Sequence, residues 1–204
     1  MQTLSRKGRS EILSKLEDEL VRQLKPKQAA EILEFSLLHY GTSSSEEISE
    51  RRLDELYGAT LECWHFFQQL DPGKPKVKVF NPDFEENGWQ STHTVIVILQ
   101  EDIPFLIDSV RMEVNRRELT IHSIHNSIMA VKRDARGRCQ QVMPSEGTDS
   151  SIPRESVIYL EVDRHTDQAQ LKDLNNTLVE ILNEAVLVTA DFSKMRVKAD
   201  SLMG

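Results

Sequence analysis

Residues 92–137 read THTVIVILQEDIPFLIDSVRMEVNRRELTIHSIHNSIMAVKRDARG. An alternating apolar segment at 95–99 predicts a strand, and Pro104 then opens a helical pattern. A second alternating segment follows at 120–132, and the turn residues of 134–137 end it. The order predicts a β-α-β unit with a polar loop at its first corner. Because small-molecule sensing domains are often built this way, the stretch favours a regulatory or assembly segment over a self-contained enzyme.

The composition describes an acidic chain. Its 204 residues carry a net charge of −8 and a pI near 5.3, which argues against a chain-wide surface for nucleic acid or anionic membrane. The N-terminus has no apolar signal core, and no run approaches the roughly 18 apolar residues of a membrane span. Cys63 and Cys139 show no C-x-x-C spacing, so no disulfide framework is expected. We therefore expect a soluble protein of the reducing cytoplasm.

Apolar residues at spacings of three and four predict helices in the first third of the chain. Ser10 is the expected N-cap of the first helix, and Pro26 suits the first turn of the second. The predicted helices cover residues 10–24, 26–41 and either 46–69 or 49–69. The breaker at 71–75 then closes a helical cap of residues 1–72.

Alternation returns after this breaker and predicts an α+β domain at residues 73–204. Besides the β-α-β unit, the pattern predicts strands at 76–80, 138–142 and 156–162, a helix at 167–183, a polar connection at 83–90 and a flexible loop at 143–155. The strand at 138–142 is expected to pair back as a hairpin. The order β-α-β-β-α is the ferredoxin-like theme, so we expect an α/β sandwich with a mainly antiparallel sheet.

The tail of the chain allows two structures. Residues 185–189 form either a closing strand or a continued helix, because periodicity cannot decide over so short a run, and 191–202 predict a helix. The fourth edge strand therefore comes either from the tail or from 76–80. Helices are expected on one face of the sheet, with the other face or an edge offered to a neighbour and partly covered by the helical cap.

The corner at 101–106 is the candidate binding site. A strand-to-helix turn exposes backbone N–H groups at the N-terminus of the helix, and these suit an anion such as a carboxylate. Asp102 either caps the helix itself or accepts a ligand ammonium.

Motifs for catalysis or metal binding are missing from the sequence, which has no H-E-x-x-H, no G-x-S-x-G and no glycine-rich phosphate loop. His122 and His125 face opposite sides of one predicted strand, so they do not form a two-ligand metal face. Cys63, beside Trp64, is expected to be a buried structural thiol, and Cys139 is expected to be exposed. The sequence thus predicts neither a metal site nor catalytic residues.

Charged residues crowd the helix of the β-α-β unit. They are Arg111, Glu113, Arg116 and Arg117. Such charges usually form a solvated face, and the alternative is a contact with another subunit or domain.

Several strings between Val79 and Asp134 match a known pattern. They are VFNP at 79–82, GW at 88–89, HTV at 93–95, EDIPFLIDSV at 101–110, NR at 115–116, IH at 121–122 and RD at 133–134. Together they resemble the N-terminal region of the large bacterial NAD-specific glutamate dehydrogenases. The resemblance extends more weakly over YGATLECWHF at 57–66 and over Asp191-Phe192.

This resemblance implies a parent enzyme that oxidatively deaminates L-glutamate to 2-oxoglutarate and ammonia with NAD, its catalytic domain lying beyond Gly204. The present segment would be a non-catalytic, ACT-like regulatory and assembly region without a cofactor of its own. Its partners would be the rest of the parent chain, other subunits of a homo-oligomer and an amino-acid effector, with no nucleic acid or membrane. The alternative is a pure interaction scaffold that binds no small molecule.

ACT-like domains commonly carry D-x-P-G-x-L in the loop after the first strand. The matching residues here are Asp102, Ile103, Pro104, Phe105 and Leu106, and the resemblance makes them the ligand-binding candidates. Phe105 stands where the glycine would let a ligand approach the backbone, and its side chain would crowd that approach. The departure favours assembly over amino-acid binding.

Overall fold

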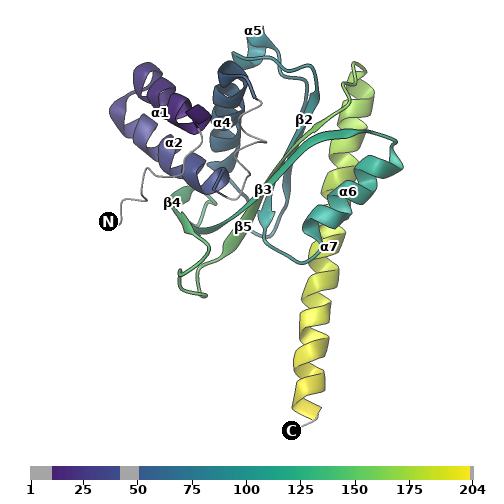
Figure 1. The fold of residues 1–204 in the computed structure, drawn as a ribbon. Helices are drawn as coiled ribbons and strands as arrows, with labels where there is room; N and C mark the ends of the chain where they lie inside the picture. Colours follow the sequence, from purple (N-terminus) through teal and green to yellow (C-terminus); the bar gives the residue numbers. More distant parts are fainter. Residues whose placement is uncertain (1–10, 42–50, 203–204) are drawn as a thin grey trace.

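The computed structural model describes residues 11–41 and 51–202, with side chains as far as 189. The described residues form one antiparallel sheet flanked by helices (Figure 1). Its strands are β1 (Lys76–Phe80), β2 (Thr94–Glu101), β3 (Ile121–Arg133), β4 (Cys139–Pro144) and β5 (Arg154–Val162), in the order β1-β2-β5-β3-β4. The predicted α+β class and antiparallel sheet are confirmed, and β4 pairs with β3 as the expected hairpin.

The interior strand β2, which lies between β1 and β5, is buried on both of its faces. Val95, Val97 and Leu99 belong to one core, whereas Ile96 and Ile98 belong to a second core on the opposite side. Successive side chains of a strand point to opposite faces, so the alternation in the sequence divides the apolar residues between the two cores. Full burial on both sides explains the unbroken apolar run at residues 95–99 of this strand.

The N-terminal helices form the layer over the first core. They are α1 (Glu11–Gln23), α2 (Pro26–His39) and α4 (Leu53–Phe67). Pro26 opens α2 as expected, because its fixed φ suits the first helical turn. The third helix begins at Leu53, later than predicted, since residues 51 and 52 are not helical. The expected cap at Ser10 and the predicted helix start at Glu46 or Ser49 lie outside the described residues.

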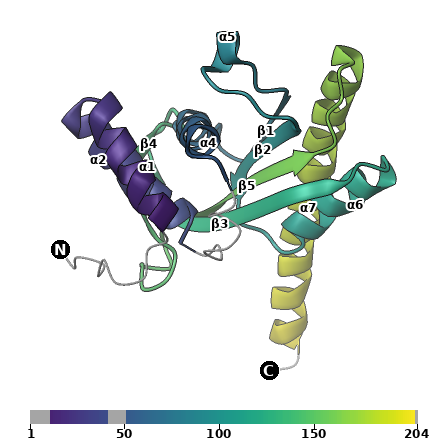
Figure 2. The same ribbon diagram turned by 45° about the horizontal axis from the view of Figure 1, so that its top comes forward.

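Two further helices cover the opposite face of the sheet, as Figures 1 and 2 both show. They are α6 (Leu106–Arg116) and α7 (Gln168–Leu202). Val110 of α6 and Leu178 of α7 are fully buried in the second core. The helical cap covers the first-core face, as expected in part, and that face is not left to a neighbour: the sheet is the middle of three layers. The reason is that every strand pair between β1 and β3 has apolar side chains on both sides, and both need cover.

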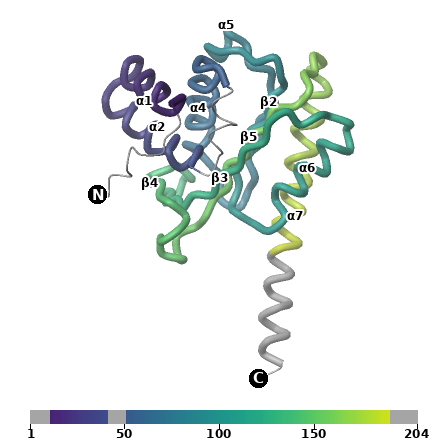
Figure 3. Tube along the Cα trace, in the orientation of Figure 1, coloured from purple at the N-terminus to yellow at the C-terminus, as the bar shows by residue number. Residues whose placement is uncertain are grey.

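The fourth strand of the ferredoxin-like sheet is β1, which pairs antiparallel with β2 along one edge. The alternative, a strand from the tail, was wrong, since residues 185–189 continue α7 (Figure 3). Thr189 Oγ1 donates to the Ala185 carbonyl at 2.8 Å, as in a continuous helix. No helix in the described ranges has the length and apolar character needed to cross a membrane.

The connections differ in detail from the prediction. The polar connection between β1 and β2 holds a short helix, α5 (Phe84–Asn87), whose N-terminal Glu85 N–H is capped by the Asp83 carboxylate at 2.8 Å. Because β4 and β5 extend towards each other, the loop between them is shorter than predicted and covers 145–153.

Candidate functional site

The predicted corner lies between the end of β2 and the start of α6. Phe105 there has φ 64° and ψ 11°, a left-handed conformation that costs a residue with a Cβ about 1–2 kcal/mol. Its side chain is 75% exposed. The backbone thus has the conformation that glycine favours in D-x-P-G-x-L, while the phenyl ring projects into solvent.

Asp102 is bound to the neighbouring strand β5. Its N–H donates to the Arg154 carbonyl at 2.8 Å, and its Oδ1 accepts from Ser156 Oγ at 3.2 Å. Helix α6 begins after Phe105 and has no side-chain cap. The interpretation of Asp102 as the cap of this helix was therefore wrong.

The five corner residues do not converge on one point. Leu106 is buried in the second core and Ile103 packs against it, whereas Pro104 and Phe105 are exposed. Two cavities of about 550 and 570 Å³ lie elsewhere, and neither is lined by residues 102–106.

Two charged residues, Glu113 of α6 and Arg117 at its C-cap, form the polar contact between α6 and α7. Glu113 is buried and accepts from Arg116 at 2.7 Å and from Arg117 at 2.6 Å. These bonds, that from Arg116 first, lower the pKa of the Glu113 carboxyl. Arg117 also donates to Thr177 and Asp173 of α7, both at 2.8 Å. The predicted solvated face is thus, at Glu113 and Arg117, an internal contact between helices.

Four histidines form two pairs of rings. His39 is buried, shares a 2.8 Å hydrogen bond between its Nδ1 and Ser127 Oγ, and lies with its ring 4.5 Å from that of His125. The rings of His93 and His122 are 4.3 Å apart. In the part of the chain that the structure describes, no three His, Cys, Asp or Glu side chains form a group that could hold a metal ion.

A polar cavity of about 570 Å³ lies beside both pairs. Its lining includes Tyr40, Arg51, His93, Arg111, His125 and Glu161. Arg51 forms an ion pair with Glu161 and lies 4.9 Å from the centre of the Tyr159 ring. Two charged lining residues, Arg51 and Glu161, are therefore already paired with each other.

The two thiols are shielded to different degrees. Cys63 is fully buried as expected, and burial raises its pKa to about 12. Cys139 is half-buried rather than exposed, because β4 lies against the N-terminal helices, and burial raises its pKa as well. Both shifts disfavour the thiolate that a nucleophilic cysteine requires.

The second cavity, of about 550 Å³, was not predicted from the sequence. It lies at the end of the sheet where β2 ends and β5 begins, and Gln100 and Glu155 are among its buried lining residues. The one signal in the sequence is a glutamine that ends an otherwise apolar run in a central strand. Loops 70–74, 134–137 and 151–153 complete the cavity, and only the fold brings these segments together.

Comparisons with known proteins assign most of the chain to one family. A family model described as "Glutamate dehydrogenase, ACT1 domain" matches residues 35–178. The NAD-specific glutamate dehydrogenase of Halomonas elongata is 50% identical over 192 residues, or 94% of this chain. That of Pseudomonas aeruginosa is 36% identical over 196 residues, or 96% of this chain. The chain spans 12% of the length of each relative.

Proposed function

The chain belongs to the family of the glutamate dehydrogenase ACT1 domain, and we propose that it is the non-catalytic regulatory and assembly domain of an NAD-dependent glutamate dehydrogenase. The parent enzyme would oxidise L-glutamate to 2-oxoglutarate and ammonia, with NAD bound outside this segment. The partners of the domain would be the rest of the parent chain and other subunits of a homo-oligomer. The free thiols of Cys63 and Cys139 suit the reducing cytoplasm that we propose as its location.

The corner between β2 and α6 supports the assembly role. Phe105 has a left-handed backbone, yet its ring is 75% exposed and covers no core. A strained residue with an exposed aromatic ring has no benefit for folding, because the strain costs free energy and the ring gains little burial. Aromatic side chains of this kind are common anchors of protein interfaces. We assign Phe105 to a contact with another part of the enzyme.

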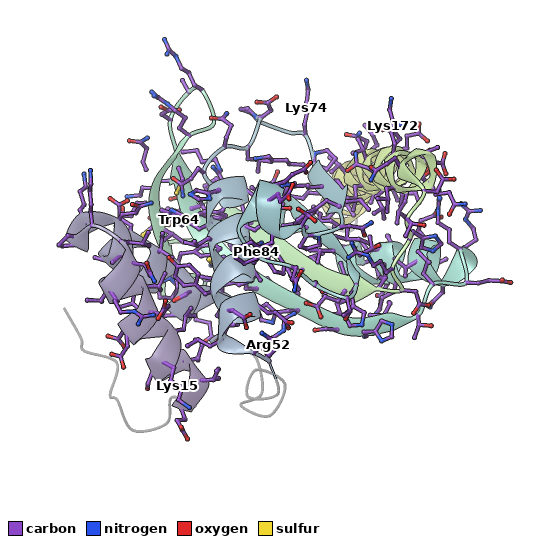
Figure 4. The ribbon with its side chains drawn as sticks, turned by 90° about the horizontal axis from the view of Figure 1, so that it is seen from above. Lys15, Arg52, Trp64, Lys74, Phe84 and Lys172 are labelled. Atoms are coloured by element: carbon purple, nitrogen blue, oxygen red, sulfur yellow. The ribbon has the colours of Figure 1, made fainter. Side chains whose placement is uncertain are left out.

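An exchange at Phe105 in the complete enzyme tests this assignment. Phe105→Asn removes the ring but retains the left-handed backbone, which asparagine tolerates. Phe84→Asn is the matched control, because Phe84 of α5 (labelled in Figure 4) is 68% exposed and lies outside the corner. We expect Phe105→Asn alone to weaken assembly in light scattering and to alter glutamate-dependent NADH formation. Equal behaviour of the two variants would contradict the assembly role.

Amino-acid regulation is the second part of the proposal. An effector at the corner would bind through Asp102 and the backbone of residues 103–106, at the uncapped N-terminus of α6. Titration with amino acids by calorimetry tests it, with Asp102→Asn as the variant.

The competing proposal, a scaffold without a ligand, is favoured by an exposed apolar residue on α6, the helix that follows Phe105. Met112 lies seven residues after Phe105, two helical turns along, and is 73% exposed. Absence of heat with every amino acid, together with weakened assembly in Phe105→Asn, would leave the scaffold alone.

A further inference from the structure

Gln100 is the most unusual polar residue of the sheet. It lies on the interior strand β2 and is 1% exposed. Both of its amide atoms, Nε2 and Oε1, are buried without a hydrogen-bond partner among the described residues. Buried amides are nearly always hydrogen-bonded, because an unmade bond leaves the cost of desolvation uncompensated. A buried amide without hydrogen bonds does not help the protein to fold. We therefore looked for a binding role of Gln100.

Two charged residues that line the cavity, Arg133 and Glu155, are satisfied by one another. Glu155 accepts from Arg133 through both carboxylate oxygens, each at 2.7 Å. Arg133 also donates to the carbonyls of Phe67 and Gly137, both at 3.0 Å. The alternation of β2 and β5 places Glu155 on the face of the first core, whereas Gln100 and its cross-strand neighbour Ser156 lie on the face of the second core.

The cavity itself has the character of a small-molecule site. Its volume is about 550 Å³, within the range of roughly 300–1,000 Å³ that is usual for ligand pockets. Apolar walls come from four separate segments, at Leu70, Val131, Ile152, Pro153 and Val186. Lys74 and Lys132 line it as well; both are exposed and have no ion pair within the described ranges. Lys74 stands on the loop before β1 in Figure 4.

We propose that this cavity binds a small molecule through the carboxamide of Gln100. Gln100 is one of the residues that line the cavity. Its amide is buried, so binding requires a change in the outer side-chain torsions that turns the amide toward the ligand. A glutamine amide presents a donor beside an acceptor, and its complement is a ligand edge with an acceptor beside a donor. The apolar walls accept the body of the ligand, and the two lysines accept an anionic group.

Two kinds of metabolite carry such an edge together with an anion. One is an amino acid with a carboxamide side chain, and the other is an adenine nucleotide, whose N6 and N7 atoms match a glutamine amide. The site adjoins the corner, since Glu101 lines the cavity, but residues 102–106 do not line it. It does not depend on the assembly proposed at Phe105.

Calorimetry on the protein with L-glutamine and with AMP tests the site. L-glutamate lacks the side-chain amide and is the matched control for L-glutamine. Ribose 5-phosphate lacks the base and is the matched control for AMP. We expect binding of L-glutamine or AMP that is at least tenfold tighter than binding of its control. A bound ligand should also slow hydrogen exchange in loops 70–74 and 151–153. Absence of binding by both, or protection confined to other segments, would overturn the proposal.

Two variants probe the role of the amide. Gln100→Leu keeps the volume of the side chain but removes the amide, and Val186→Trp fills the cavity from α7. Both should weaken binding at least tenfold, whereas Gln140→Leu, at an exposed position of β4, should leave it unchanged. Unchanged affinity in Gln100→Leu and Val186→Trp would overturn the assignment. A ligand that responds to Asp102→Asn instead belongs to the corner.

Discussion

Arg133 of β3 and Glu155 of β5 form a buried, two-pronged ion pair that joins the sheet to the end of the N-terminal helical layer. Their side chains are only 11% and 6% exposed, and the Arg133 guanidinium also lies 5.0 Å from the centre of the Phe67 ring of α4. Bidentate pairing fixes the relative position of the two strands. One side chain thus links β3, β5 and α4 beside the cavity that contains Gln100.

Loss of this arginine should be strongly destabilising. Arg133→Ala leaves the Glu155 carboxylate buried and unpaired, which typically costs about 3–5 kcal/mol. Urea unfolding measures the change. Arg138→Ala is the control, because the Arg138–Asp134 pair has an arginine side chain that is 60% exposed, and exposed pairs contribute up to about 1 kcal/mol. A similar loss of unfolding free energy in both variants would show that the burial of an ion pair does not determine how much it stabilises this protein.

Relief of the strained backbone should stabilise the protein. Phe105→Gly removes a left-handed strain of about 1–2 kcal/mol, and the greater freedom of glycine in the unfolded chain offsets roughly 0.5–1 kcal/mol of this gain. A net increase of about 0.5–1 kcal/mol is expected in chemical unfolding. The same substitution at Phe84, a helical position, should lower stability instead. A loss of stability in Phe105→Gly would mean that the ring contributes more than its exposure indicates.

A glycine inside α4 should not tolerate alanine. A Cβ at Gly58 would lie 2.1 Å from Cγ of Trp89, a residue that is only 4% exposed. Gly58→Ala should therefore destabilise the protein by about 1–3 kcal/mol through overpacking, although alanine favours the helix. In a Trp89→Leu background the cost should shrink, and a double-mutant cycle by thermal unfolding measures this coupling. An additive result would rule out the contact as the cause.

Stability should fall in mildly acidic solution because of His39. Burial, with smaller contributions from His125 and Arg51, holds the pKa of His39 well below the ordinary histidine value of 6.5. Below pH 6.5 the unfolded chain binds a proton that the folded protein excludes, so stability is full above that pH. It is lost as the pH falls towards the folded pKa, with a slope of up to about 1.4 kcal/mol per pH unit.

Unfolding experiments between pH 7.5 and about pH 5 check this dependence. His39→Gln should flatten the profile, because glutamine does not titrate. His65→Gln, at an exposed position of α4, should retain the wild-type profile. A wild-type slope in His39→Gln would place the titrating group elsewhere.

Local patterns predicted most of the elements correctly. Strand β1 has the predicted bounds, and the parity of β2 places Val97 and Ile98 in opposite cores as the alternation indicates. Local patterns failed where two conformations suit the same residues. Residues 185–189 are apolar and β-branched, yet they continue α7, because the helix that precedes them propagates and β1 already occupies the edge beside β2.

At the candidate site, too, the sequence predicted some features and missed others. The string at 101–110 identified the family, and Phe105, which aligns with the glycine of D-x-P-G-x-L, is the residue whose backbone is left-handed. The hydrogen bond of Asp102 could not be predicted, because its partner Ser156 lies 54 residues away in the sequence. Sequence spacing says nothing of which distant strand will supply a hydrogen bond.

By itself, then, the sequence determined the family, the strand and helix order and the two faces of β2, since these follow from short-range spacing and steric preference. Only the tertiary structure decided that both faces are covered, that Arg117 binds α6 to α7, and that the amide of Gln100, beside a cavity, finds no partner among the described residues. The physical reason is that burial and hydrogen-bond satisfaction depend on segments that are far apart in the chain and meet only after packing.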